Sequence, residues 1–281
     1  MNKLYGLLSC NPLFIRTPYT TVLVLMSDKL KTNLVQIEQQ NRTSLQVSGL
    51  TKSFGRTRVL NDLDLSIEAG EVLSVLGSNG SGKTTLINII STLAKPDRGI
   101  VNICGYSIEK HSNQIRSSIG LVGHSPMLYS EMTGLENLTF FGRLFRVESL
   151  NNRITETADK LGISNILDQK VGNMSHGMQK RIAIARSLLS SPKLLLMDEP
   201  ESGLDQSAVG LLRVIINDLK KSTCAVLLVT HSLDQAVNLG DRVAILSNGK
   251  VGYDQATELV DIKKLTEKYF EYSDQFKKVK T

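Results

Sequence analysis

Apolar and polar residues alternate in two early stretches of the chain and then give way to short, largely apolar runs. Residues 45–54 and 58–71 alternate as half-buried antiparallel strands do. The run VLSVLG at 72–77 is typical of a buried central strand. KLLLMDEP at 193–200 and CAVLLVTH at 224–231 share this character and end in polar residues. The pattern therefore predicts an antiparallel β subdomain and a buried parallel sheet.

Helical patterns lie between these strands and are concentrated over about 125–190. The segment LINIISTLA is expected to form a helix that Pro96 ends. Thr133 and Glu136 fit a capping box ahead of NLTFFGRLF, and Gly162 is placed to close the helix ITETADKLG. Buried strands that alternate with helices, interrupted by a helical insertion, predict an α/β core with a small helical lobe.

A glycine-rich segment follows the strand 72–77 and fits the pattern G-x-x-x-x-G-K-[ST]. Its backbone N–H groups would converge on a phosphate chain, and the helix that follows presents its positive end. Lys83 would bridge the β- and γ-phosphates of ATP, and the Thr84 hydroxyl would bind Mg²⁺. The alternative is a glycine-rich turn that binds nothing, but a strand before and a helix after favour a P-loop NTPase core. The candidate ATP-contacting residues are Gly77, Ser78, Asn79, Gly80, Ser81, Gly82, Lys83, Thr84 and Thr85.

Two acidic residues, Asp198 and Glu199, end the apolar run LLLM. A buried parallel strand delivers side chains from its carboxyl end to the crevice where ligands bind in such sheets. Asp198 is placed to hold Mg²⁺ through water, and Glu199 to polarise the attacking water. Alone, the two acids would fit a plain strand terminus or a helix cap. Coupled to a phosphate loop, they indicate hydrolysis of ATP.

The segment NMSHGMQKR at 173–181 places Ser175 beside His176 at the start of an expected helix. A Ser-His hydrolase would need an orienting acid and a nucleophile elbow, and neither is apparent. Ser175 instead fits an N-cap, because an apolar face follows it. A serine hydroxyl, free N–H groups and the helix dipole make an anion site. The apolar face consists of Ile182, Ala185, Leu188 and Leu189.

In this order, the phosphate loop, the two acids and the segments NMSHGMQKR, ESGLD and VTH resemble the motifs of the nucleotide-binding subunits of ABC transporters. The resemblance spans about residues 45–254. It implies the ABC ATPase fold, ATP hydrolysis coupled to transport, and a separate integral-membrane permease subunit. It also implies a cytoplasmic protein, peripheral on the inner face of the cell membrane, with no nucleic acid as a partner.

Residues 174–178 occupy the place of the family's signature motif, usually written LSGGQ. The resemblance implies a head-to-tail homodimer in the ATP-bound state. In that dimer Ser175, Gly177 and Met178 would cover the γ-phosphate held by the partner's phosphate loop. Since the chain has one copy of each motif, a closed site needs two chains.

Other positions follow from the resemblance. His231 matches the switch histidine that contacts the γ-phosphate and the attacking water; otherwise it would be a hydrogen-bonded strand end. Residues 202–205 match the loop that joins the two active sites. Phe54 matches the aromatic that stacks on adenine, and its alternative is a core aromatic at a strand end. His124 stands where the family places a glutamine, and an imidazole there can titrate near neutral pH.

A narrower resemblance rests on Gly123-His124, on the Ser-x-Gly-Met-Gln signature and on LTFFGRLF. These features are similar to the ATP-binding subunits assigned to haem export in cytochrome c biogenesis. The alternatives are an ATPase of another small-molecule or multidrug exporter and a non-transport ABC ATPase acting on ribosomes or DNA. The altered signature and His124 also leave open a regulatory module with feeble hydrolysis.

Charge and composition change this picture little. The formal net charge is +6 in 281 residues, and residues 1–43 carry half of it, so no strongly basic domain is indicated. No apolar run reaches the roughly 20 residues that a membrane helix needs. Cys104 and Cys224 are expected to pack as small apolar groups, and with Cys10 they show no metal-ligand spacing.

The chain is expected to divide into three parts. Residues 1–43 would be an extension that is disordered, or a misassigned start with synthesis beginning at Met26. Residues 44–254 would be the ATP-binding domain, and 255–281 a helical tail of amphipathic character.

Overall fold

The computed structural model describes residues 43–279, so the extension predicted for 1–43 lies outside the described residues except for Thr43. The strands are β1 (Thr43–Phe54), β2 (Thr57–Glu68), β3 (Val72–Leu76), β4 (Arg98–Ile103), β5 (Tyr106–Ser107), β6 (Ile119–Val122), β7 (Leu194–Asp198), β8 (Ala225–Val229), β9 (Arg242–Ser247) and β10 (Lys250–Ala256). The α-helices are α2 (Lys83–Ile90), α3 (Ser112–Ser118), α4 (Gly134–Leu144), α5 (Leu150–Lys160), α6 (His176–Leu188), α7 (Gln206–Lys221), α8 (Leu233–Leu239) and α9 (Ile262–Val279). Short 3₁₀ turns lie at Ser164–Ile166, Val171–Asn173 and Thr257–Leu259.

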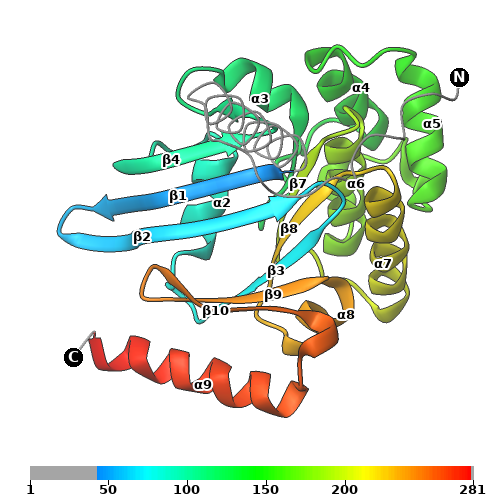
Figure 1. Ribbon diagram of the computed structural model, residues 1–281. Helices are drawn as coiled ribbons and strands as arrows, with labels where there is room; N and C mark the ends of the chain where they lie inside the picture. Colours follow the sequence, from blue (N-terminus) through cyan, green and yellow to red (C-terminus); the bar gives the residue numbers. More distant parts are fainter. Residues whose placement is uncertain (1–42, 280–281) are drawn as a thin grey trace, which may run out of the picture. The chain divides into compact units, whose positions relative to one another are not determined.

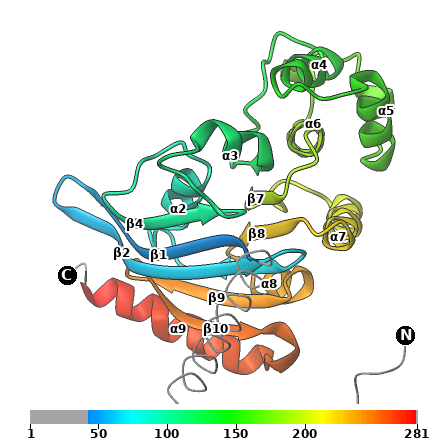
Figure 2. The ribbon, with the colours of Figure 1, turned by 45° about the horizontal axis from the view of Figure 1, so that its top comes forward.

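Two sheets organise these elements (Figure 1). A four-stranded antiparallel sheet has the order β2-β1-β4-β5, and a six-stranded sheet has the order β10-β9-β3-β8-β7-β6. In the larger sheet the strands from β9 to β6 are parallel, and β10 pairs antiparallel with β9 at the edge. The helices α4 and α5 lie away from the antiparallel sheet (Figure 2). The predicted fold class is therefore confirmed.

Alternate residues of the central strands enter two different hydrophobic clusters, which explains why those strands are apolar throughout. In β7, Leu194 and Leu196 join the cluster shared with the antiparallel sheet and α2. Leu195 and Met197 point to the other face and join the cluster of α6 and α7. Because both faces are covered, no position in β7 is left for a polar residue until Asp198.

Three helix ends that the sequence predicted are present, two with a side-chain cap and one with a left-handed glycine. The Thr133 hydroxyl accepts from the backbone N–H of Glu136 at 3.1 Å, and the Glu136 carboxylate accepts from the N–H of Thr133 at 2.8 Å. Ser175 caps α6, since its Oγ accepts from the N–H of Met178 at 3.3 Å. Gly162, with φ +60°, follows the end of α5. All three are confirmed.

The helix of the phosphate loop is shorter than its sequence pattern indicated. It was expected to run to Pro96, but α2 ends at Ile90. Thr92 adopts φ +63°, and its N–H bonds to the carbonyl of Ile89. A residue in this left-handed region ends a helix before any proline is reached.

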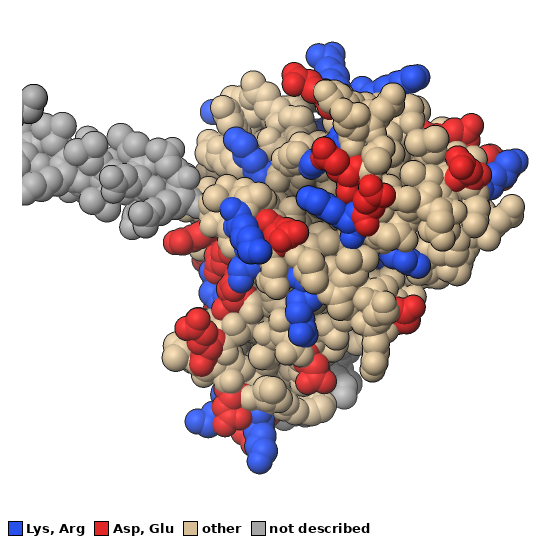
Figure 3. Space-filling model, turned by 90° about the vertical axis from the view of Figure 1, so that its right-hand side faces the viewer, with Lys and Arg blue, Asp and Glu red and all other residues tan. Residues whose placement is uncertain are grey.

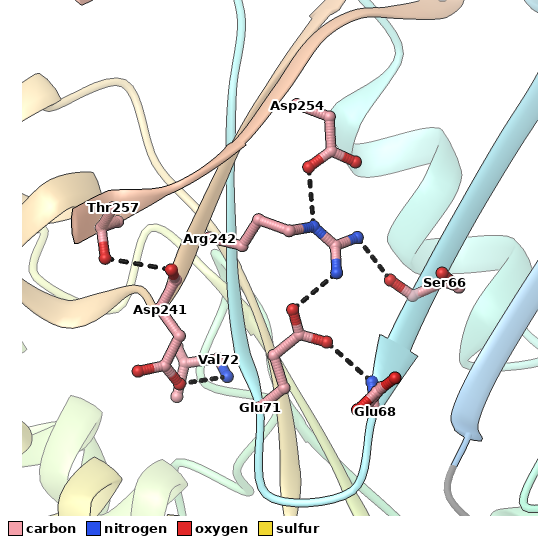
Figure 4. Close-up of polar contacts among 8 residues, drawn as sticks. All are labelled: Ser66, Glu68, Glu71, Val72, Asp241, Arg242, Asp254 and Thr257. Atoms are coloured by element: carbon pink, nitrogen blue, oxygen red, sulfur yellow. Dashed lines mark hydrogen bonds and ion pairs between the residues drawn. The ribbon is translucent and has the colours of Figure 1, made fainter. Parts of the chain in front are cut away.

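A polar network joins the starts of β3 and β9 to the neighbouring strands (Figure 4). The Arg242 guanidinium donates to Asp254 Oδ1 at 2.7 Å and to Glu71 Oε1 at 2.5 Å. Its third bond, at 2.6 Å, goes to the carbonyl of Ser66 in β2. The antiparallel sheet is thereby tied to the larger sheet at the end opposite to the phosphate loop.

The tail contains the predicted helix, and the division into three parts stays a prediction. Leu265 of α9 is fully buried in the cluster with β9, and the Tyr272 ring packs over Gly252 of β10. On the face drawn in Figure 3, basic and acidic side chains are interspersed. Within residues 43–279, no helix has the length and apolar character to cross a membrane.

Candidate nucleotide-binding site

The phosphate loop, residues 77–82, connects β3 to α2 and depends on two glycines. A Cβ on Gly77 would lie 2.6 Å from the carbonyl oxygen of Leu246 and 2.6 Å from Ser81 Oγ. Gly82 has φ +110°, and a Cβ there would meet Leu60 Cδ2 at 2.7 Å. Only glycine satisfies both the conformation and the close approach, so the backbone turns tightly into the start of α2.

Lys83 is held against this loop. Its Nζ donates to the carbonyl of Gly77 at 2.7 Å and to that of Ser78 at 3.0 Å. Burial lowers the pKa of Lys83, while the nearby charges of Glu199 and Asp198 act in the opposite direction. The ammonium therefore lies between the loop and the two acids, where a phosphate chain would compete for its donors.

One buried hydroxyl in the loop has no hydrogen-bond partner. Ser81 Oγ is buried and unpaired in the part of the chain that the structure describes. A buried donor without an acceptor is costly. Asn79 and Gly80 are exposed, Thr85 is half-buried, and the N–H groups at the start of α2 are free for an anion. These features fit a phosphate group.

Thr84 and Asp198 supply the oxygen donors expected for Mg²⁺. Thr84 Oγ1 lies 3.4 Å from Asp198 Oδ2, and Asp198 is only 6% exposed. Burial raises the pKa of Asp198, and the charge of Glu199 raises it further, against the Thr84 hydrogen bond and the charges of His124 and Lys83. Among the described residues no group of three or more His, Cys, Asp or Glu side chains could hold a metal. A hydroxyl and one carboxylate suit Mg²⁺, which takes its remaining ligands from phosphate and water.

Glu199 and His231 face each other at the ends of β7 and β8. His231 Nδ1 lies 3.2 Å from Glu199 Oε1, and the N–H of Glu199 bonds to the carbonyl of Val229 at 2.8 Å. Glu199 adopts φ +49°, a conformation that side-chain-bearing residues rarely take and that occurs at functional sites. His231 lies two residues beyond β8, in a loop, so the expected strand-end position is wrong. Together the pair can orient a water molecule and accept its proton.

The signature residues lie elsewhere in the chain. His176 packs against Gly203, where a Cβ would lie 2.4 Å from the imidazole Nδ1. Within residues 43–279, no hydrogen bond or ion pair joins Ser175, Gly177 or Met178 to the phosphate loop. The signature therefore contacts the 202–205 loop of its own chain.

His124 and Phe54 are both exposed. His124 follows β6, and its charge reaches Asp198. The Phe54 ring is 56% exposed, and Lys52 Nζ lies 5.4 Å from the ring centre. The alternative that Phe54 is a core aromatic is thus excluded, and its role with adenine stays a prediction.

Sequence reasoning missed four polar residues near this site that are buried or half-buried. Arg186 donates to the carbonyls of Leu121 and Met127, and burial lowers its pKa to about 10. Its place on the apolar face, four residues after Ile182, is a signal that could have identified it. No short-range pattern marks the other three: Lys180, Glu201 and Thr230.

Comparisons with known proteins agree with this geometry. The sequence pattern of the family described as "ABC transporter" matches residues 60–202. The chain is 35% identical to the ABC transporter ATP-binding protein NatA of Bacillus subtilis (strain 168) over 204 residues, which are 72% of this chain and 83% of that protein. It is 33% identical to the Nod factor export ATP-binding protein I of Ralstonia nicotianae (strain ATCC BAA-1114 / GMI1000) over 219 residues, which are 77% of this chain and 68% of that protein.

A solved structure has the same arrangement of elements. It is described as the dimeric structure of a post-hydrolysis state of the ATP-binding cassette MJ0796 bound to ADP and Pi. The TM-score is 0.70 at 28% identity, over 76% of this chain and 98% of that chain.

Proposed function

Because the chain belongs to the ABC transporter family, we propose that it is the ATP-hydrolysing subunit of an exporter and drives a separate integral-membrane permease. The observation that carries the proposal is the meeting of five side chains at one edge of the sheet. Lys83 faces Asp198 and Glu199, Thr84 contacts Asp198, and His231 contacts Glu199. These are the groups that in-line attack of water on a γ-phosphate requires.

Each group has a defined part in the reaction. Lys83 turns from the loop carbonyls to the β- and γ-phosphates and stabilises their charge. Glu199 accepts a hydrogen bond from the attacking water, and His231 orients Glu199 and contacts the γ-phosphate. Thr84 and Asp198 would hold Mg²⁺, which neutralises developing charge on the phosphate oxygens. Phe54 stacks on adenine, and His124 contacts the water near the metal.

ATP also joins two copies of the chain in this proposal. Within the described part of the chain, no hydrogen bond or ion pair joins the signature residues to the phosphate loop, so in this proposal a partner supplies them. The dimeric cassette structure described above supports this arrangement, because its fold matches over 76% of the chain. ATP binding closes the homodimer, and hydrolysis lets it reopen. The permease uses this closing and reopening of the homodimer to drive transport.

An exposed apolar surface on α4 suits the permease. The α4 patch consists of Tyr129, Phe140 and Leu144, which are 51%, 41% and 63% exposed. Phe140 and Leu144 are four residues apart and so share one side of the helix. Tyr129 packs edge-on to Phe140 with ring centres 5.2 Å apart. Exposed apolar groups of this kind mark interaction sites, and here the partner would hold the chain at the inner face of the membrane.

For the transported molecule, we propose only a chemical class and no identity. The relative named for Nod factor export supports export of a small molecule. Haem export stays a prediction that rests on His124 and on the altered signature, since neither relative bears on haem.

The test is purification of the tagged protein from detergent-solubilised native membranes, followed by mass spectrometry and an absorption scan for haem. A multi-span membrane protein should co-purify, and its identity would define the cargo class. Phe140→Ser/Leu144→Ser should lose it, whereas Val214→Ser on α7, which removes another exposed apolar side chain, should keep it. Ribosomal or nucleic-acid partners without a membrane protein would contradict the transporter proposal and leave an ATPase.

A further inference from the structure

A lysine with no exposed surface lies behind the two acids of the site. Lys180, in the second turn of α6, is 0% exposed. Its Nζ donates to the carbonyl of Gly123 at 3.3 Å, and among residues 43–279 it has no ion pair within 4 Å. An ammonium group carries three donors, so this contact leaves it short of acceptors. A buried cation in that state requires a compensating negative charge nearby.

The carboxylate of Glu201 lacks a hydrogen-bond donor on one oxygen, which complements the missing acceptors of Lys180. Glu201 Oε1 accepts from the Thr230 hydroxyl, but Glu201 Oε2 is buried and has no hydrogen-bond partner in the described part of the chain. Thr230 is fully buried, and its hydroxyl also accepts from the N–H of Ser232 at 3.0 Å. Glu201 is therefore fixed to the loop that carries His231, while one of its oxygens remains open.

Electrostatics places the two groups in one cluster. Burial lowers the pKa of Lys180, and the charges of Asp198, Glu201 and Glu199 oppose that effect, in this order. The start of the same helix packs against the segment that follows these carboxylates, because His176 contacts Gly203. The ammonium therefore lies within electrostatic reach of the carboxylates of 198–201, with none of them within 4 Å of it. Its one hydrogen bond reaches the residue before His124. The cluster spans the signature helix, the end of β6 and the loops after β7 and β8.

We propose that Lys180 is a positioning residue for ATP hydrolysis, pairing with the open oxygen of Glu201 to fix the loops of Glu199 and His231 against α6. In the described part of the chain, Lys180 Nζ and the Glu201 oxygens are more than 4 Å apart, so the pairing requires α6 and the loop after β7 to approach each other, and it would complete the bonding of both groups within one chain. A movement of α6, the helix that begins at the signature, would then be transmitted directly to Glu199 and His231, which orient the attacking water. This inference rests on the proposed function, because it assigns a regulator of the same site.

The test is a double-mutant cycle on the full chain, measured as kcat and KM for ATP. Lys180→Met removes the charge at similar volume, and because removing one member of a buried charge pair can destabilise a protein, its folding is checked separately. Glu201→Gln keeps the shape of Glu201. Each single variant should lower kcat about tenfold or more, as displaced catalytic groups do. KM should stay within about twofold, because among residues 43–279 no hydrogen bond or ion pair joins either residue to the phosphate loop. The double variant should be no slower than the slower single variant.

Lys160→Met on α5 is the matched control, since Lys160 is exposed and its variant should behave as wild type. Thermal unfolding checks that each variant folds; if Lys180→Met does not, Glu201→Gln alone decides. Wild-type kcat in either folded variant, or strictly additive effects in the double variant, would overturn the pairing. A wild-type protein without ATPase activity would instead refute the proposed function.

Discussion

Asp97 illustrates how one exposed carboxylate organises its surroundings. Its Oδ1 accepts from Lys52 Nζ at 2.9 Å, and its Oδ2 accepts from the N–H of Ser53 at 2.6 Å. The hydrogen bond from Lys52, followed by that from Ser53, holds the pKa of Asp97 below its usual value. Lys52 also lies over the ring of Phe54, so the same carboxylate anchors the strand end predicted to meet adenine.

Asp97 therefore makes stability depend on pH in a defined direction. Its folded-state pKa lies below the unfolded value of about 3.9, so the stabilisation is complete above that pH and is lost as the pH falls through the folded value. Asp97→Asn should lower the free energy of unfolding at pH 7, and the difference from wild type should close on acidification. Urea unfolding of both proteins at a series of pH values measures this difference in the free energy of unfolding. A difference that persists unchanged at the lowest pH would contradict the assignment.

A single thiol shows how burial suppresses reactivity. Cys224 is buried, and desolvation raises its pKa to about 12. At pH 8 almost none of the reactive thiolate is present. Cys224 should therefore resist alkylation by iodoacetamide in the native protein and react fully in denaturant. Mass spectrometry of the peptide containing Cys224 reads this out. Equal labelling in both states would contradict its placement.

At the scale of elements, the Arg242 network fastens the two sheets together. Arg242 and Glu71 are partly buried and Asp254 is exposed, and Arg242→Met would leave both carboxylates without their cation. We expect a loss of about 2 kcal/mol in the free energy of unfolding. Lys221→Met, which removes a lysine that is 80% exposed and 3.6 Å from Asp218, should change it by less than about 0.5 kcal/mol. A loss for Arg242→Met as small as that for Lys221→Met would show that the network adds no stability.

The elements also show what a sequence reveals of a fold and of a site. The phosphate loop, the acids at the end of β7 and the cap at Ser175 were predictable, because a short stretch of chain carries each signal. The Lys180–Glu201 cluster was not, because it depends on β6, β7 and β8 being neighbours. The end of α2 depends on the left-handed Thr92, which propensity does not anticipate. The strands β6, β9 and β10 were not predicted from the sequence, although β9 is an apolar run followed by Asn248-Gly249, a pair that favours a hairpin turn.

At the scale of the whole molecule, the site of one chain is half of a proposed active unit. The phosphate loop, Asp198, Glu199 and His231 gather at one sheet edge. The signature residues contact the 202–205 loop of the same chain, and among residues 43–279 no hydrogen bond or ion pair joins them to the phosphate loop. In a head-to-tail dimer, the phosphate loop of each chain would meet the signature residues of the other chain, which gives two complete sites. This arrangement accounts for the single copy of each motif.

The most direct test of this account is the oligomeric state of Glu199→Gln with ATP, measured by light scattering after size-exclusion chromatography. The variant should bind ATP and accumulate as a dimer while losing turnover, because binding is intact and water is no longer polarised. Adding Ser175→Arg should leave ATP binding nearly intact and keep the protein monomeric. Undiminished turnover in Glu199→Gln, or a dimer that survives Ser175→Arg, would contradict the account.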